Sequence, residues 1–301
     1  MSVDNQKINI PLLKEKQVSL TIKREDLIHP NISGNKFRKL HYNLKAAKQS
    51  GYETILTFGG AYSNHIAATA YAAKVQGLNT IGVIRGDELF SQWRQNPTLS
   101  LAHKHGMLFK FVSREAYRKK DLPEFKKTLE AEFGAGYWLP EGGTNDLAVK
   151  GCEEILQPGD AEFDVICCAV GTGGTLAGIS NSAEEAQRIF GFPALIGNFL
   201  KEDIRKFAPR RNWQLQRDYH FGGYAKVTAE LIEFVNDFYE MTQIPLDAVY
   251  TGKMIYGILD MIKNDGFAPN TNILAIHTGG LQGNEGMNQK LKQKNLPLIH
   301  Y

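Results

Sequence analysis

The chain contains three short segments whose residues could do chemistry, and the first holds a lysine at the start of a predicted helix. Phe37, Leu40 and Leu44 fall at helical spacing, which predicts a helix beginning at Asn35 or Lys36. The helix dipole is positive at its N-terminus, so it disfavours an ammonium ion there and favours the free amine. A free amine is what a Schiff-base lysine requires. A solvated lysine behind an ordinary polar cap fits the spacing equally well.

The second segment is a glycine-rich loop that follows an apolar run and opens a helix. Its residues are Gly171, Thr172, Gly173, Gly174 and Thr175. Glycines let the backbone approach an anion, and helix N-terminal amides stabilise negative charge. We interpret the loop as a phosphate cradle rather than a plain turn. Leu176 stands where a dinucleotide fingerprint has its third glycine, and the lysine of a nucleotide P-loop is missing.

The third segment is Ser63, Asn64 and His65, between an apolar run and an alanine-rich helical stretch. Ser63 and Asn64 are both good N-cap residues, so capping alone would explain them. The free amides at such a helix start could also bind a carboxylate.

Apolar strand-like runs alternate with helical patterns along the chain, and these elements must position the three segments. The expected strands cover residues 54–58, 80–84, 107–112, 163–170, 194–199 and 272–277. The expected helices include residues 64–76, 227–241 and 253–263. The strands form two βαβ series that part near residue 140. This rhythm predicts two α/β lobes with mostly parallel sheets and a cleft between them.

The composition excludes several classes of protein. The 301 residues carry 35 Lys and Arg against 32 Asp and Glu, a balance that gives no electrostatic reason to expect nucleic acid or an anionic membrane as partner. The one basic run, residues 114–127, is expected to form a solvated helical face. Three cysteines make no disulfide framework, and adjacent Cys167 and Cys168 lack zinc-site spacing, so we expect buried thiols and no metal. No secretory leader or membrane-length apolar run is visible, which favours a cytoplasmic protein.

Taken together, the motifs resemble those of the fold-type II pyridoxal phosphate enzymes, the tryptophan synthase β superfamily. More narrowly, the chain resembles the 1-aminocyclopropane-1-carboxylate deaminase and D-cysteine desulfhydrase family. Six matching motifs occur in the family's order, at residues 23–26, 34–40, 63–65, 171–175, 250–253 and 277–280. The resemblance implies two open, twisted, mostly parallel-sheet domains with flanking helices, an active site in the interdomain cleft, and a homodimer. It assigns residues 1–46 and 143–301 to a large cofactor-binding domain and residues 47–142 to a small domain.

The same resemblance implies roles in holding pyridoxal 5'-phosphate. Lys36 would carry the cofactor as a Schiff base. The glycine loop would hold the phosphate, with Lys39 supporting it from the other side. Asn64 would hydrogen-bond the phenolic oxygen, and Thr278 would lie against the pyridine nitrogen.

For the amino-acid substrate, the resemblance implies a second group of residues. Ser63, Asn64 and His65 would bind the carboxylate through their amides, with the Ser63 hydroxyl also near the Cα proton. Tyr224 and Tyr250 match the two active-site tyrosines, although from spacing alone they could be amphipathic surface residues.

Three departures or variable positions bear on the reaction. Glu141 stands where the family more often has a small apolar residue, and it would change substrate choice if it pointed into the cleft. The segment 204–219 is charged and matches the family poorly. In the deaminase branch a glutamate reaches the pyridine nitrogen from the position of Thr251. Thr251 and Thr278 are both neutral, so we expect a weaker electron sink, sufficient to expel a thiolate.

We therefore predict β-elimination on a D-amino acid, with D-cysteine giving pyruvate, hydrogen sulfide and ammonia. Lys36 or a tyrosinate would remove the Cα proton. The alternatives are a 1-aminocyclopropane-1-carboxylate deaminase giving 2-oxobutyrate and ammonia, a Rossmann-type oxidoreductase, and a non-catalytic cofactor-binding protein.

Overall fold

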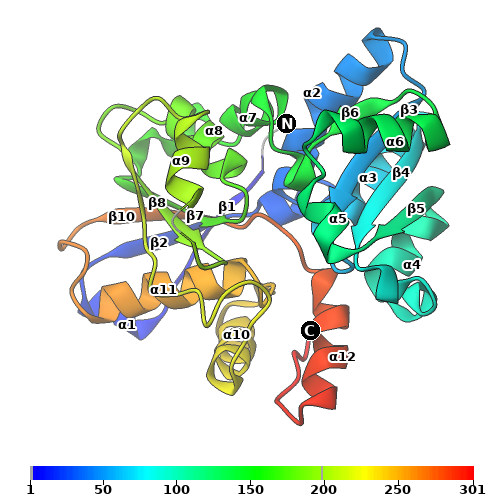
Figure 1. The fold of residues 1–301 in the computed structure, drawn as a ribbon. Helices are drawn as coiled ribbons and strands as arrows, with labels where there is room; N and C mark the ends of the chain where they lie inside the picture. The colour runs from blue at the N-terminus through cyan, green and yellow to red at the C-terminus, as the bar shows by residue number, and fades with distance from the viewer. Residues whose placement is uncertain (1–2, 198) are drawn as a thin grey trace.

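The computed structural model describes residues 3–197 and 199–301 and shows two α/β lobes, each built around its own sheet (Figure 1). The larger sheet has six strands, all parallel except β1, in the order β1 (Asn5–Lys7), β2 (Ser19–Lys23), β10 (Asn272–Ile276), β7 (Val165–Val170), β8 (Arg188–Pro193) and β9 (Trp213–Leu215). The smaller sheet is wholly parallel, in the order β5 (Met107–Val112), β4 (Asn79–Arg85), β3 (Thr54–Gly59) and β6 (Tyr137–Leu139). The predicted α/β class with two mostly parallel sheets is confirmed.

Helices cover the faces of both sheets, as parallel strands require. In chain order they are α1 (Pro11–Glu15), α2 (Asn35–Gln49), α3 (Asn64–Val75), α4 (Pro97–Lys104), α5 (Arg114–Arg118), α6 (Pro123–Phe133), α7 (Asp146–Glu153), α8 (Gly174–Ser182), α9 (Phe199–Arg205), α10 (Ala229–Thr242), α11 (Thr251–Lys263) and α12 (Gly283–Gln293). No helix in the described residues is long and apolar enough to cross a membrane.

The central strand β7 shows how the larger lobe is held together. All six of its residues are buried, and successive side chains enter two different cores because they point to opposite faces of the sheet. Val165 and Cys167 pack on the side of α10 and α11, whereas Ile166 and Cys168 pack on the side of α7 and α8. The expectation that the cysteines are buried free thiols is confirmed.

Helix α2 packs against both lobes. Its apolar residues Leu40 and Leu44 join a core with Ile55 of β3 in the smaller lobe. On its other side it meets α7 so closely that a Cβ at Gly151 would lie 2.0 Å from the carbonyl oxygen of Arg38. The helix is therefore wedged between the lobes. The division of the chain into domains at residues 46–47 and 142–143 stays a prediction.

One expected strand is wrong. Residues 194–197 form a bend and an irregular link, Asn198 lies outside the described residues, and Phe199 already belongs to α9. The strand is β8, one step earlier in the chain. It was missed because it contains Gly191 and ends in Pro193, residues that weaken a strand signal, although Pro193 occupies the last strand position.

Candidate active site

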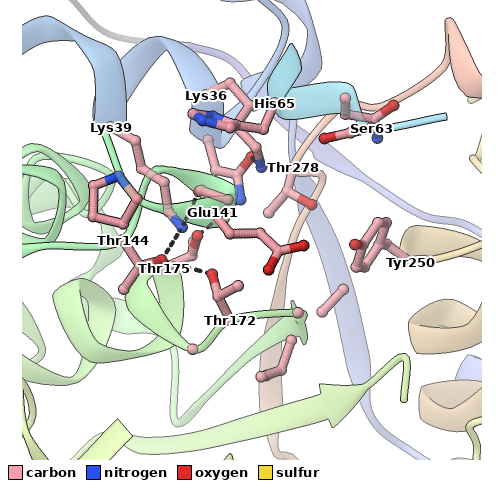
Figure 2. A pocket seen from close by; sticks show the side chains of 18 of the residues that line it. Lys36, Lys39, Ser63, His65, Glu141, Thr144, Thr172, Thr175, Tyr250 and Thr278 are labelled. Atoms are coloured by element: carbon pink, nitrogen blue, oxygen red, sulfur yellow. Dashed lines mark hydrogen bonds between the residues drawn. The ribbon is translucent and has the colours of Figure 1, made fainter. Parts of the chain in front are cut away.

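A cavity of about 860 Å³ lies between the lobes, at the edge where β3, β7 and β10 end. The carboxyl ends of parallel strands are the usual place for a ligand in an open α/β sheet. The sequence-predicted residues that line it are Lys36, Lys39, Ser63, Asn64, His65, Gly171, Thr172, Gly173, Thr175, Tyr224, Tyr250 and Thr278. Gly174 lies just behind the lining as the first residue of α8. The fold thus gathers segments that are far apart in the sequence (Figure 2).

Lys36 lies in the first turn of α2, which begins at Asn35 as predicted. The helix follows Gly34, whose φ of 62° is accessible mainly to glycine. A Cβ at Gly34 would lie 1.9 Å from the carbonyl oxygen of Thr278, and the Asn35 N–H donates to that oxygen at 3.3 Å. The start of α2 is therefore fixed against the loop after β10.

The amine of Lys36 has a lowered pKa and a hydrogen-bond partner in the structure. Its Nζ donates to the side-chain oxygen of Asn35 at 3.0 Å. Burial, and next the positive charge of Lys39, lower the pKa of Lys36 from 10.5 to about 7. The sequence indicated a depressed pKa from the helix dipole, and the structure adds desolvation and a like charge as causes. A substantial part of Lys36 is thus the free amine near neutral pH.

The glycine loop ends at the N-terminus of α8. Gly173 is the cap residue, with a φ of 85°, and no side chain caps the helix. Lys39 lies opposite: its Nζ donates to the Thr144 hydroxyl at 2.9 Å and to the Gly142 carbonyl at 3.2 Å. The Thr144 hydroxyl is 2.6 Å from that of Thr172 (Figure 2). Uncapped amides, hydroxyls and an ammonium group together suit a phosphate.

Two residues of this half of the site were missed by the sequence analysis. Thr144 contacts Lys39, and the side chain of Asn35 donates to the Thr175 hydroxyl at 2.8 Å. Thr144 follows two glycines in a turn, the same small-residue pattern that marks the loop at Gly171, and that signal could have identified it.

The segment that opens α3 forms the other wall. Ser63 caps the helix by accepting from the Ile66 N–H at 3.3 Å, and the Asn64 side chain accepts from Gln282 at 2.8 Å. His65 is buried, and its Nε2 lies 2.7 Å from the Thr57 hydroxyl. Burial, with the nearby lysine charges, holds the pKa of His65 well below its usual range. The imidazole is therefore neutral and already hydrogen-bonded to Thr57, which leaves the backbone amides of this segment to bind a carboxylate.

Tyr224 and Tyr250 both line the cavity, Tyr250 half-buried and Tyr224 still 44% exposed to solvent. Their ring centroids are 6.2 Å apart with an interplanar angle of 64°. Burial, and next the neighbouring Tyr224, raise the pKa of Tyr250 well above 10, and desolvation also raises the pKa of Tyr224. Both hydroxyls therefore keep their protons at neutral pH. This disfavours a tyrosinate base and favours the amine of Lys36.

Thr251 does not reach the cavity, which corrects one step of the sequence analysis. It is fully buried in the first turn of α11, and its hydroxyl donates to Asp247 Oδ1 at 2.8 Å. The Asp247 carboxylate also accepts from the Thr251 N–H, so it caps the helix. Thr278 does line the cavity and is left as the neutral hydroxyl at the predicted ring-nitrogen position.

Glu141 points into the cavity in the direction of Tyr250 (Figure 2). Its Oε2 lies 3.5 Å from Nζ of Lys120, which also lines the cavity. Residues 114–127, expected as one solvated helical face, instead form α5 and the start of α6, with Lys120 between them. The substrate end of the site is therefore more highly charged than the sequence indicated.

Comparisons with known proteins agree with this geometry. The model of a family described as "Pyridoxal-phosphate dependent enzyme" matches residues 4–279. A bifunctional D-cysteine desulfhydrase/1-aminocyclopropane-1-carboxylate deaminase of Arabidopsis thaliana is 32% identical, over 88% of this chain and 73% of the relative. A Pyrococcus horikoshii protein provisionally named a 1-aminocyclopropane-1-carboxylate deaminase is 32% identical, over 90% of this chain and 87% of the relative. The crystal structure of an "ACC deaminase homologue" superposes with a TM-score of 0.81 at 29% identity, covering 97% of this chain and 94% of that one.

Proposed function

The chain belongs to the pyridoxal-phosphate dependent enzyme family, and from this premise we propose that it catalyses β-elimination on a D-amino acid, with D-cysteine as the leading substrate. The products would be pyruvate, hydrogen sulfide and ammonia. Family membership excludes the Rossmann-type oxidoreductase. The homodimer and the cytoplasmic location stay predictions from the sequence.

The residues of the cavity fit the cofactor. Lys36 offers an amine with a pKa of about 7 to the aldehyde. The uncapped N-terminus of α8 and the ammonium group of Lys39 offer amides and a charge to the phosphate. When bound, the cofactor withdraws electrons from the Cα of the amino acid joined to it. The roles of Asn64 and Thr278 toward the ring remain part of the proposal.

The protein's own groups would hold the substrate and move its proton. The amides that open α3 at Ser63 would hold the carboxylate, because they lie at the positive end of the helix. The amine of Lys36, once released, would take the Cα proton, since its depressed pKa leaves it able to accept one near neutral pH. Tyr250 would donate a hydrogen bond rather than act as a base.

The observation that carries the choice of reaction is the position of Thr278. Thr278 lines the cavity, where its neutral hydroxyl would be the partner of the ring nitrogen, whereas Thr251 is turned away into the core. A neutral partner does not hold a protonated ring nitrogen as a carboxylate would, so a good leaving group such as a thiolate is favoured over an unactivated cyclopropane. Deamination of the cyclopropane substrate is the second candidate, since a relative carries both names.

The test compares two products from one preparation. We expect kcat/KM for pyruvate from D-cysteine to exceed that for 2-oxobutyrate from 1-aminocyclopropane-1-carboxylate by about a hundredfold, which corresponds to about 2.7 kcal/mol of transition-state stabilisation. Lys36→Ala should abolish both activities. Lys45→Ala is the matched control, because this lysine lies exposed on the same helix. A preference for the cyclopropane substrate would overturn the proposed reaction.

A further inference from the structure

A second cavity, of about 310 Å³, adjoins the substrate end of the site. The two cavities share Gly60, Asn64, Arg85, Tyr224, Tyr250 and Gly280. Because Tyr224 and Tyr250 line both cavities, the side cavity is continuous with the substrate site rather than a separate pocket. Its volume equals that of about ten liquid water molecules. It therefore has room for a substituent that extends beyond the substrate's Cβ.

Among the charged side chains that line the side cavity, cations outnumber carboxylates. Its cationic residues are Arg85, Arg114 and Lys290, and its acidic residue is Asp247. The negative charge of Asp247 is already engaged, because its oxygens accept from three consecutive backbone N–H groups of residues 249–251. The cavity thus favours an anionic occupant over a neutral or cationic one.

Among the three cations, Arg85 is the least engaged by the described residues: its guanidinium carbon lies 5.8 Å from the centroid of the Tyr117 ring. Arg114 pairs with Glu88 at 2.6 Å, and Nζ of Lys290 lies 3.9 Å from the centroid of the Tyr62 ring. Within residues 3–197 and 199–301, no carboxylate pairs with Arg85.

The position of Arg85 places its charge at the junction of the two cavities. It is the last residue of β4, at the carboxyl edge of the smaller sheet. One guanidinium nitrogen lies 3.7 Å from where a Cβ of Gly60 would be, and Gly60 precedes the turn that opens α3 at Ser63. A planar guanidinium with several free N–H groups matches a carboxylate or another oxyanion.

Resting on the proposed β-elimination, we propose that the side cavity binds an anionic group carried on the Cβ substituent of the substrate, and that Arg85 is the specificity-determining residue. The substrate class is a D-amino acid whose leaving thiol bears an acid. S-carboxymethyl-D-cysteine and water would give mercaptoacetate, pyruvate and ammonia. The amine of Lys36 takes the Cα proton, and the electron pair of the Cα–H bond forms the Cα–Cβ double bond. The Cβ–S bond breaks with its pair on sulfur, sulfur takes up a proton, and water hydrolyses the released 2-aminoacrylate to pyruvate and ammonia.

The test uses the holoenzyme and two substrates of nearly equal shape, S-carboxymethyl-D-cysteine and its neutral amide, S-carbamoylmethyl-D-cysteine. We expect the wild type to prefer the acid by about ten- to a hundredfold in kcat/KM, the usual effect of one charged hydrogen bond. Arg85→Gln should bring the ratio close to one, and Arg85→Lys should retain part of it. Arg94→Gln is the matched control, because Arg94 is an exposed arginine of the same lobe outside both cavity linings. A ratio near one in the wild type, or an unchanged ratio in Arg85→Gln, would overturn the proposal.

A failure of the proposed reaction is distinguishable from a failure of the side cavity. If neither D-cysteine nor the two S-substituted substrates gives pyruvate, the β-elimination is wrong. Calorimetric binding of D-2-aminoadipate against its terminal amide then decides the role of Arg85, because these ligands carry no leaving group. Tighter binding of the acid that disappears in Arg85→Gln supports the anion site, and equal binding refutes it.

Discussion

Gly34→Ala is expected to damage both the stability and the active site of the protein, and Gly51→Ala provides a matched control. The two glycines flank α2, and both have positive φ, 62° and 75°. A Cβ at Gly34 would lie 1.9 Å from the Thr278 carbonyl oxygen, whereas a Cβ at Gly51 meets nothing within 4 Å. Gly34, at φ 62° and ψ −140°, adopts a conformation that is essentially restricted to glycine and costs another residue about 1–3 kcal/mol, and a Cβ there also makes a steric clash that Gly51 lacks.

The size of the difference follows from these contacts. A left-handed backbone costs an L-residue about 1–2 kcal/mol, which is all that Gly51→Ala should lose. Gly34→Ala adds overpacking, typically about 1–3 kcal/mol, because the added methyl group meets a backbone carbonyl rather than a flexible side chain that could move away. The backbone cost and the overpacking together give an expected loss of about 2–6 kcal/mol for Gly34→Ala. The displaced start of α2 should also move Lys36 away from Thr278.

Urea unfolding and cofactor occupancy measure the two effects. Gly34→Ala should unfold at a clearly lower urea concentration than Gly51→Ala and should bind less cofactor, as read from its visible absorption band. If the two variants unfold within about 0.5 kcal/mol of each other and both bind cofactor fully, the contact between α2 and the loop after β10 is not what fixes the lysine.

Three further predictions concern the cavity. In the apoprotein, the rate at which an amine-directed acylating reagent modifies Lys36 should rise through pH about 7 and then level off, since the ammonium form is unreactive. Lys39→Gln should move the midpoint of this pH profile upward, because it removes the like charge. An unmoved midpoint would contradict that cause. Thr175→Val should weaken cofactor binding about tenfold in a titration, and an unchanged dissociation constant would exclude its hydroxyl from the phosphate site. Thr251→Glu should lower the free energy of unfolding by about 3–5 kcal/mol, because it buries a carboxylate beside Asp247. A variant that keeps its stability and shows an altered absorption band would show that residue 251 reaches the cofactor.

The sequence alone was enough for most of the framework and for the local structure of the segments that line the cavity. The start of α2 could be predicted because Phe37, Leu40 and Leu44 mark one helical face, and a local pattern needs no knowledge of the rest of the fold. The strand β7 and the loop after it could be predicted because a continuous apolar run followed by glycines has few other structures.

Contacts between distant residues could not be predicted in the same way. The bond between Asn35 and Thr175 joins residues 140 positions apart, and that between Lys39 and Thr144 joins residues 105 apart. The direction of a side chain at a helix start also escapes local patterns. Thr251 occupies the position from which a glutamate reaches the ring nitrogen in the deaminase branch, but here its hydroxyl hydrogen-bonds to Asp247 in the core.

The placement of both lysines on one helix explains why the site depends so strongly on α2. Lys36 and Lys39 are three residues apart, so they lie on the same face and their charges repel. Lys39 donates to a hydroxyl and to a carbonyl, whereas Lys36 donates to one amide oxygen, so the charge is better stabilised on Lys39. Burial first, and then the charge of Lys39, lower the pKa of Lys36 to about 7, so Lys36 is the amine that gives up its proton near neutral pH. The helix that carries the cation proposed for the phosphate thus also lowers the pKa of the lysine proposed as the nucleophile. The hydrogen bond from the Asn35 N–H to the Thr278 carbonyl holds the start of that helix against the loop after β10.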